Sequence, residues 1–199
     1  MASGACGYQQ FDPMTLTSSN PRTRQRLLEL ERILPELAGR SVLDLGANHG
    51  LVSLLAAQRG ARRVRAVEKN AESVAAIREA CRISGLPVEV EHRSVWDMPD
   101  HEGAEVVLAL EILHWLVFHG ATPGEAIAKL CALTERSLFI ETPWEAPPVA
   151  EGSKRTFAAY DIRAILESLL EEGFSVEVLH FCRYTGRTRP RVMLRADRR

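Results

Sequence analysis

A short segment in the first third of the chain combines an acidic residue with two glycines, namely Asp44, Gly46 and Gly50. Glycine lets the backbone turn sharply and come close to a ligand, and the helix expected after Gly50 presents N–H groups without helical partners. The spacing G-x-x-x-G lacks the G-x-G-x-x-G pattern that seats a pyrophosphate, and the segment has no phosphate-binding lysine. Because the carboxylate of Asp44 would repel a diphosphate, the turn favours a ligand with positive charge, such as a sulfonium that carries an amino-acid tail.

A second acid, Glu68, ends the next predicted strand, one strand–helix–strand unit after Asp44. At this place in an α/β sheet, a carboxylate accepts hydrogen bonds from ribose hydroxyls. The alternative is a solvated glutamate at the start of a helix. Together with the glycine turn, Glu68 favours the ribose interpretation.

The elements that must position these residues alternate between strand and helix. Short apolar runs predict strands, and apolar residues at helical spacing predict helices. We expect strands at 41–45, 63–67, 88–92, 105–110, 137–141, 175–182 and 191–196, and helices at 21–37, 51–59, 71–84, 123–134 and 160–172. This alternation predicts an α/β fold, a three-layer αβα sandwich with a seven-stranded, mostly parallel sheet. The last two strands have no helix between them and predict an antiparallel C-terminal hairpin strand.

The chain divides into two expected parts. Residues 1–38 are expected to form a cap or lid segment with a short helix, and residues 39–199 a Rossmann-like domain. Asn20 suits the N-cap of the cap helix and Pro21 its first position. We expect this helix to run to Leu37, with Gly39 as the stop.

In sequence order, these motifs resemble the cofactor half of class I S-adenosylmethionine-dependent methyltransferases. The segment 94–99 is similar to the loop around the adenine, 110–116 to the segment near the transferred methyl group, and the final hairpin to the reversed seventh strand of that fold. The resemblance covers the chain from Arg40 to its end. Two positions depart from the pattern: Asn48 replaces a glycine found in many members, and Ser94 replaces a frequent aspartate.

The resemblance implies S-adenosyl-L-methionine as the cofactor. Asp97 is then a candidate partner for the exocyclic amine of the adenine, in place of the missing aspartate. The implied cofactor-binding residues are Asp44, Gly46, Ala47, Asn48, Gly50, Glu68, Lys69, Ser94, Val95, Asp97 and Glu111.

The candidate catalytic residues, Glu111 and His114, follow the fourth predicted strand. Methyl transfer from a sulfonium depends largely on alignment, and a hydroxyl acceptor also needs a base within hydrogen-bond reach. His114 is the first choice for that base; the alternative is that it only packs in a helix cap. Glu111, His114 and His119 could also be read as metal ligands, but a full ligand set is not evident and no metal is expected.

Four aromatic residues are candidates for substrate binding. They are Tyr8, Trp115, Trp144 and Tyr160. The N-terminal segment and the loop between Trp144 and Tyr160 are insertions around a standard sheet, where substrate choice is often set. The alternative is that both are ordinary surface loops.

Composition restricts the classes of partner. The 25 basic and 26 acidic residues give a net charge of −1, which argues against a dedicated polyanion binder. The four cysteines form no C-x-x-C pair, which disfavours a disulfide framework or a zinc knuckle. The most apolar stretch, 106–118, contains Glu111 and His114 and is shorter than the roughly 20 residues of a membrane span. We therefore expect a cytoplasmic protein without membrane association.

These observations favour methyl transfer to an O or N atom of a small-molecule acceptor. The alternative acceptor is RNA, for which Arg187, Arg189, Arg191 and Arg195 could form a phosphate-binding strip on one strand face. The other interpretation of these arginines is charge that protects an edge hairpin. A non-catalytic S-adenosylmethionine-binding subunit is the alternative from another class, and a dehydrogenase is disfavoured by the missing glycine pattern.

Overall fold

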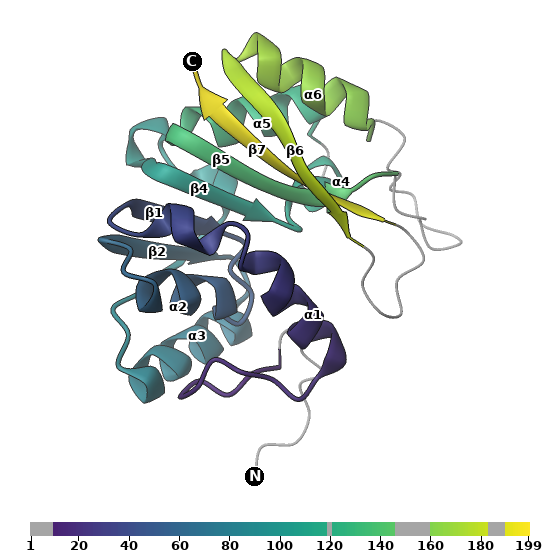
Figure 1. The fold of residues 1–199 in the computed structure, drawn as a ribbon. Coiled ribbons are helices and arrows are strands. Elements are labelled where there is room, and N and C mark those ends of the chain that lie inside the picture. Colours follow the sequence, from purple (N-terminus) through teal and green to yellow (C-terminus); the bar gives the residue numbers. More distant parts are fainter. Residues whose placement is uncertain (1–9, 119–120, 146–159, 183–189) are drawn as a thin grey trace, which may run out of the picture.

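The computed structural model describes residues 10–118, 121–145, 160–182 and 190–199. Seven strands form one sheet in the order β3-β2-β1-β4-β5-β7-β6 (Figure 1). The strands are β1 Ser41–Leu45, β2 Arg63–Glu68, β3 Glu89–His92, β4 Ala104–Leu110, β5 Thr134–Pro143, β6 Phe174–Cys182 and β7 Arg191–Arg198. Only β7 is antiparallel to its neighbours, β5 and β6. The predicted sheet and its reversed C-terminal strand are confirmed.

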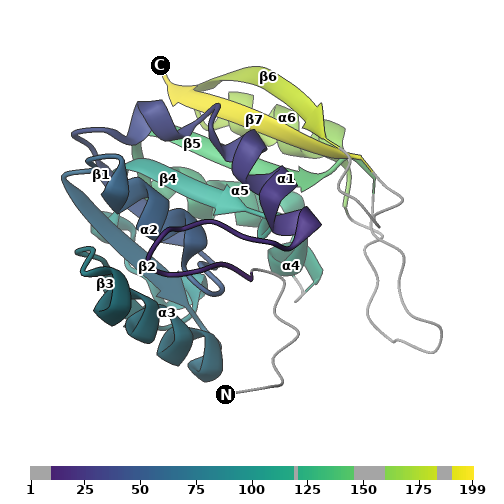
Figure 2. The same cartoon turned by 60° about the horizontal axis from the view of Figure 1, so that its bottom comes forward.

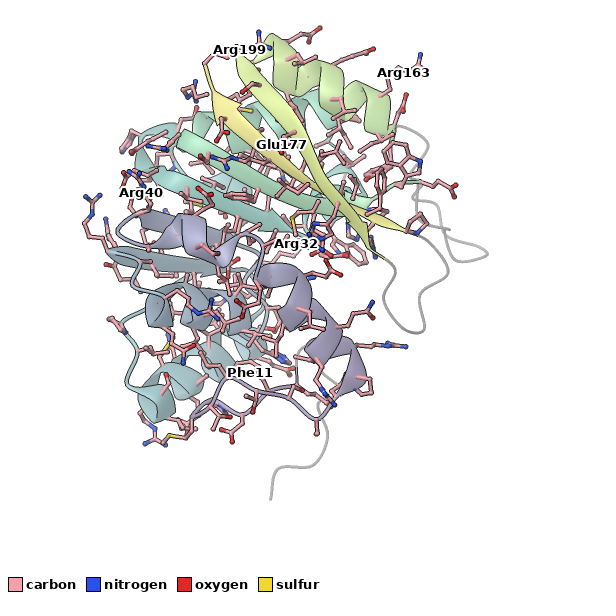
Figure 3. The ribbon with its side chains drawn as sticks, viewed as in Figure 1. Phe11, Arg32, Arg40, Arg163, Glu177 and Arg199 are labelled. Carbon is pink, nitrogen blue, oxygen red and sulfur yellow. The ribbon has the colours of Figure 1, made fainter. Side chains whose placement is uncertain are left out.

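Helices cover both faces of this sheet and complete three layers. One face carries α1 Pro21–Leu30, α2 Leu51–Gln58 and α3 Ala71–Ser84, as Figure 2 shows. The other face carries α4 Leu113–Phe118, α5 Pro123–Ala132 and α6 Ile162–Glu171. Arg163 on α6 and Arg199 at the C-terminus extend away from the sheet (Figure 3). No helix in the described part of the chain is long and apolar enough to cross a membrane.

The strand β4 shows why the sheet is buried between the two helix layers. Its residues Val107 and Ala109 pack into the apolar cluster under α4, α5 and α6. The alternate residues Val106 and Leu108 pack into the cluster under α1 and α2. A strand covered on both faces has apolar residues at nearly every position, which explains the continuous apolar run in the sequence.

The helix predicted over 21–37 is longer than the helix that the structure shows, α1. Asn20 caps α1 as predicted, because its side chain accepts hydrogen bonds from the backbone N–H of Arg22 and of Thr23. The helix ends at Leu30, and a separate 3-10 turn, η1, spans Leu34–Leu37. Pro35 is the physical reason, because proline has no N–H and its ring clashes with the carbonyl four residues earlier.

Candidate active site

A cavity of about 670 Å³ lies at the carboxyl ends of β1, β2 and β4. In an open α/β sheet this is the place where ligands bind. Its lining residues come from α1, the glycine turn, the ends of β2 and β4, the loop after β3, and α4. They are Arg26, Gly46, Asn48, Val67, Glu68, Lys69, Arg93, Ser94, Val95, Trp96, Leu110, Glu111, Ile112, His114, Trp115 and Leu116.

The glycine turn forms one wall of this cavity. Gly46 has a φ of +70° and Asn48 a φ of +53°. The positive φ favours glycine, and a Cβ atom on residue 46 would lie 2.7 Å from Cδ1 of Ile112, so that side chain would have to move. Asparagine is among the few other residues that adopt a positive φ readily, which explains how Asn48 replaces a glycine. Ala47 and Gly50 belong to the turn but do not contribute to the cavity lining.

Glu68 joins the glycine turn to the start of α3. One carboxylate oxygen accepts the backbone N–H of Asn48 at 2.9 Å, and the other accepts that of Asn70 at 2.9 Å. These two bonds fix the carboxylate at the cavity wall. A carboxylate has about four acceptor positions, so Glu68 can also accept hydrogen bonds from the hydroxyls of a bound ribose.

Asp44 is not part of the cavity lining, although the sequence analysis assigned it to cofactor binding. Its side chain is buried behind the turn and accepts a hydrogen bond of 2.6 Å from the hydroxyl of Ser53 in α2. Burial raises the pKa of Asp44 to about 6. The carboxylate was expected to face the ligand, but it points to Ser53 and supports the turn from behind.

The loop after β3 forms the wall on the predicted adenine side. Ser94 and Val95 line the cavity as predicted, and Lys69 lines it from the end of β2. Ser94 caps a short 3-10 turn by accepting the N–H of Trp96. Asp97 is exposed and does not contribute to the cavity lining. Trp96, which is 42% exposed, and Arg93 also line the cavity from this loop and were not among the predicted site residues.

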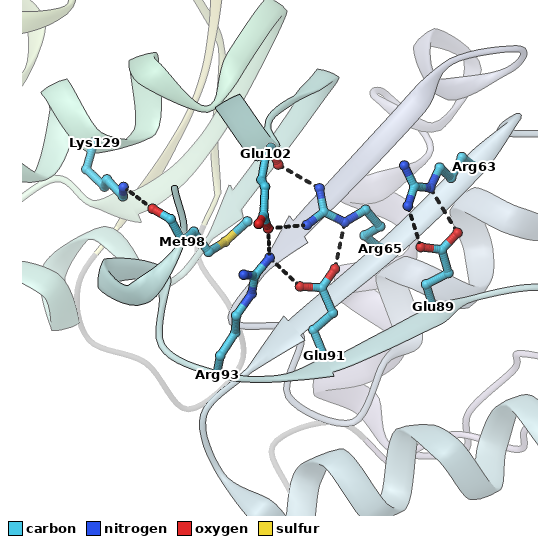
Figure 4. Close-up of polar contacts among 8 residues, drawn as sticks. All are labelled: Arg63, Arg65, Glu89, Glu91, Arg93, Met98, Glu102 and Lys129. Carbon is cyan, nitrogen blue, oxygen red and sulfur yellow. Dashed lines mark hydrogen bonds and ion pairs between the residues drawn. The ribbon is translucent and has the colours of Figure 1, made fainter. Parts of the chain in front are cut away.

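An ion-pair network supports this loop (Figure 4). Arg65 of β2 contacts Glu91 of β3 at 2.6 Å and Glu102 at 3.3 Å. Arg93 contacts the same two carboxylates. Because Arg93 also lines the cavity and directly precedes Ser94, the network ties β2, β3 and the segment before β4 to the cavity wall.

The end of β4 and the start of α4 contribute the two candidate catalytic residues to the cavity lining. Glu111 has a φ of +66°, a conformation that costs energy for a residue other than glycine and is often found at functional sites. Its carboxylate pairs with Arg191 of β7 at 2.9 Å. His114 is buried, and its ring centroid lies 5.2 Å from that of Trp115, which is about half exposed. Glu111, His114 and Trp115 all line the cavity.

The other predicted substrate residues are not brought into the cavity lining. Trp144 packs edge-on against Phe181, with 5.0 Å between ring centroids. Tyr160 is buried; its hydroxyl lies 2.6 Å from that of Thr142 and donates a hydrogen bond to the carbonyl of Pro143. Burial raises the pKa of Tyr160. Tyr8 lies outside the described residues, and so does His119 of the alternative metal interpretation.

The alternative interpretation of the C-terminal arginines as a phosphate-binding strip is not supported by the two that the structure describes on β7. Arg191 is buried and pairs with Glu111, while Arg195 contacts Asp197 at 2.7 Å and Glu36 at 3.5 Å. The hairpin of β6 and β7 does form one edge of the sheet, with β6 outermost and β7 between β5 and β6. Arg187 and Arg189 lie outside the described residues.

Sequence analysis also missed a residue that reaches the cavity from outside the predicted motifs. Arg26 of α1 lines the cavity and pairs with Glu141 of β5 at 2.6 Å. Both side chains are almost completely buried. No local pattern in the sequence joins these two residues, which are 115 positions apart.

Comparison with known proteins agrees with this geometry. A family model described as a methyltransferase domain matches residues 42–135. A ribosomal protein L11 methyltransferase from Geobacter metallireducens is 31% identical over 130 residues, which cover 62% of this chain and 42% of that protein. The chain thus spans less than half the length of this curated relative.

Solved structures show the same fold. Magnesium protoporphyrin IX methyltransferase from Synechocystis, crystallised with bound S-adenosylmethionine, has a TM-score of 0.66 and 20% identity, covering 89% of this chain and 80% of that one. A putative S-adenosylmethionine-dependent methyltransferase from Listeria monocytogenes has a TM-score of 0.68 and 17% identity, covering 86% and 97%.

Residues 42–135 thus match a methyltransferase domain, and the fold is shared with solved S-adenosylmethionine-dependent methyltransferases. The expected fold is confirmed, and the methyltransferase match over residues 42–135 agrees with the expected enzyme class and cofactor. The residues present also fit this cofactor. Gly46 exposes the backbone of the turn at the cavity wall, and Glu68 is fixed at that wall with remaining capacity to accept hydrogen bonds.

Proposed function

We propose that this protein transfers a methyl group from S-adenosylmethionine to an oxygen or nitrogen atom of a small-molecule acceptor. This proposal rests on one observation: two different groups of residues line the same cavity. Gly46 and Glu68 form a wall suited to the cofactor, whereas His114 and Trp115 form a wall with a buried imidazole and a half-exposed indole. The cavity is also within the size range of small-ligand sites, roughly 300–1,000 Å³.

The chain's residues have separate tasks in this reaction. The cofactor, when bound, supplies a methyl group attached to a positively charged sulfur. The sulfur is a good leaving group because it departs as a neutral thioether. Glu68 and the turn at Gly46 orient it, and Ser94 and Val95 enclose the adenine. The lone pair of the acceptor forms the new bond to the methyl carbon as the carbon–sulfur bond breaks, and the electron pair stays on sulfur. His114 takes the proton that the acceptor loses, since imidazole accepts protons near neutral pH.

The residues around the proposed acceptor position favour an acceptor with an apolar or aromatic part. Ile112, Trp115 and Leu116 line the cavity on the side of His114. We also propose that residues 1–38 act as a cap, because Arg26 of α1 contributes to the same cavity. The side chains of Arg191 and Arg195 are engaged with carboxylates in the protein, which favours a small acceptor over RNA.

A protein acceptor is the second candidate, because the 31% identical relative is described as a ribosomal protein methyltransferase. A methyl-labelled cofactor distinguishes the candidates when it is incubated with three separate sets of acceptors. These are phenols and amines, an RNA transcript mixture, and purified ribosomal protein L11. We expect label only in the first set, and at least about a hundredfold less with His114→Ala. Label in RNA or protein alone would contradict the small-molecule proposal.

A matched control separates catalysis from general damage. His101 is exposed in the short 3-10 turn Asp100–Glu102 and does not contribute to the cavity lining. His101→Ala is expected to keep the wild-type rate. Equal loss in His114→Ala and His101→Ala would exclude a specific role for His114.

A further inference from the structure

Two buried ion pairs lie side by side at the carboxyl ends of β4 and β5. Arg26 Nη1 lies 2.6 Å from Glu141 Oε2, with exposed side-chain fractions of 4% and 0%. Arg191 Nε lies 2.9 Å from Glu111 Oε1, with fractions of 6% and 9%. The backbone N–H of Glu111 donates to the carbonyl of Glu141 at 2.7 Å, which joins the two pairs.

Each pair presents one charge to the cavity and keeps the opposite charge behind it. Arg26 and Glu111 line the cavity, whereas Glu141 and Arg191 do not contribute to its lining. A buried charge is costly unless it is paired, so Glu141 allows a cation to be kept at this place. The cavity wall therefore carries a positive and a negative group, which is the pattern that a zwitterion requires.

Arg26 lies at the end of the cavity away from the predicted adenine wall, because its partner Glu141 belongs to β5, whereas β3 lies at the other edge of the sheet order β3-β2-β1-β4-β5. An amino-acid tail that extends from a ribose at Glu68, away from the adenine, would point toward this end. The predicted adenine wall, with Ser94 and Trp96, belongs to a different part of the cavity, after β3. The position of α1 is further defined by Glu29, whose carboxylate lies 2.7 Å from His180 of β6.

We propose that Arg26 binds the carboxylate of the methionine tail of the cofactor, an assignment that rests on the proposed function. A guanidinium carries five N–H donors in a planar fork. It can therefore bind Glu141 and a second carboxylate together. The cofactor site then includes a residue of α1, outside the residues 42–135 that match the methyltransferase family. Binding of the tail also links the N-terminal cap to the cofactor.

Two adenosyl ligands test this assignment, because only one has the tail. S-adenosylhomocysteine carries the carboxylate, and 5′-methylthioadenosine lacks the whole amino-acid part. Calorimetry gives the Kd of each for the wild-type chain and for Arg26→Met. We expect Arg26→Met to weaken S-adenosylhomocysteine about tenfold to a hundredfold, the usual effect of losing a charge-assisted hydrogen bond. The Kd of 5′-methylthioadenosine is expected to stay within about twofold.

Removing Arg26 leaves Glu141 buried without its partner, so the single variant is expected to lose stability. The double variant Arg26→Met, Glu141→Gln removes both charges and is expected to recover stability while its preference for the tailed ligand stays low. Arg24→Met removes an exposed arginine from the same helix and is expected to keep the wild-type preference.

The two ligands also separate the possible failures. A wild-type preference retained in Arg26→Met or in the double variant would overturn the assignment and leave the proposed function intact. Equal weakening of both ligands would show that Arg26 only supports the fold, which also overturns the assignment. A wild-type chain that binds neither ligand would overturn the proposed function and this inference together.

Discussion

The backbone N–H of Glu111 donates a hydrogen bond of 2.7 Å to the carbonyl oxygen of Glu141. This contact joins the ends of β4 and β5 and holds Glu111 at its positive φ of +66°. The carboxylates of both residues then face arginines from other parts of the fold, Arg191 and Arg26. The cavity wall at Glu111 and Arg26 thus depends on α1 and β7, which lie outside the family match.

The Glu111–Arg191 pair gives a first prediction. Glu111→Gln leaves Arg191 buried without a charged partner, and the free energy of unfolding is expected to fall by about 3 kcal/mol. Turnover should fall at least about tenfold, equivalent to about 1.4 kcal/mol in the barrier. Urea unfolding and initial rates measure the two effects.

The double variant Glu111→Gln, Arg191→Met separates these two effects. It removes both charges, so we expect most of the lost stability to return while turnover stays low. If turnover also returned, Glu111 would have only a structural role.

The glycine at position 46 gives a second prediction with a close internal control. Gly46 and Gly39 have φ angles of +70° and +71°, but an added Cβ meets Ile112 at 2.7 Å only at position 46 and nothing within 4 Å at position 39. Alanine at either position should cost about 1–2 kcal/mol through its φ angle. Only Gly46→Ala is expected to weaken S-adenosylhomocysteine, by at least about tenfold in Kd.

Titration of both variants with S-adenosylhomocysteine, together with urea unfolding, checks this prediction. Similar Kd values for Gly46→Ala and Gly39→Ala would mean that the turn does not approach the cofactor.

The raised pKa of Asp44 gives a third prediction, on pH dependence. The folded chain keeps this proton up to about pH 6, whereas the ordinary value is 3.8. Between these values the folded state binds more protons than the unfolded state, so this group makes stability fall as pH rises from about 4 to about 6. Above about pH 6 the effect is constant.

Asp44→Asn removes this titration and is expected to keep a hydrogen bond to Ser53. Relative to the wild type, its free energy of unfolding should rise between pH 4 and pH 7 by an amount on the order of 1–3 kcal/mol. Urea unfolding at several pH values measures this difference. A difference that does not change with pH would contradict the raised pKa.

The network below the adenine loop gives a fourth prediction. Arg65→Met removes contacts to Glu91 and Glu102 and should lower the free energy of unfolding by about 1–3 kcal/mol, because the arginine is nearly buried. Arg63→Met removes an exposed pair with Glu89 on the same two strands and should cost no more than about 1 kcal/mol.

Urea unfolding and the Kd of S-adenosylhomocysteine distinguish the two arginines. We expect only Arg65→Met to weaken the ligand, since Arg93 and the adenine wall depend on the same carboxylates. Equal ligand binding by both variants would show that the network does not position the loop.

Local patterns in the sequence were sufficient for the sheet and for much of the cofactor wall. The turn at Gly46, the strand end at Glu68 and the loop at Ser94 each lie within a few residues of their own strand, so period and glycine spacing locate them. Pro35 was a visible local signal that the cap helix should end early.

The remaining features depend on contacts between distant segments. The pairing of Arg26 with Glu141 joins α1 to β5, and Arg191 meets Glu111 only because β7 lies between β5 and β6. Strand alternation indicates which residues share a face of the sheet. It does not indicate which face other elements cover, or which elements these are. The burial of Arg191 and the position of Asp44 behind the turn could therefore not be predicted from spacing.

Calorimetric titration with S-adenosylhomocysteine, with NAD as the comparison ligand, tests the central claim most directly. The wild-type chain is expected to bind one S-adenosylhomocysteine and no NAD. Glu68→Ala should weaken that binding at least about tenfold, whereas Glu72→Ala, an exposed residue in the first turn of α3, should not. Binding of NAD alone, or of neither ligand, would contradict the assignment of this cavity to S-adenosylmethionine.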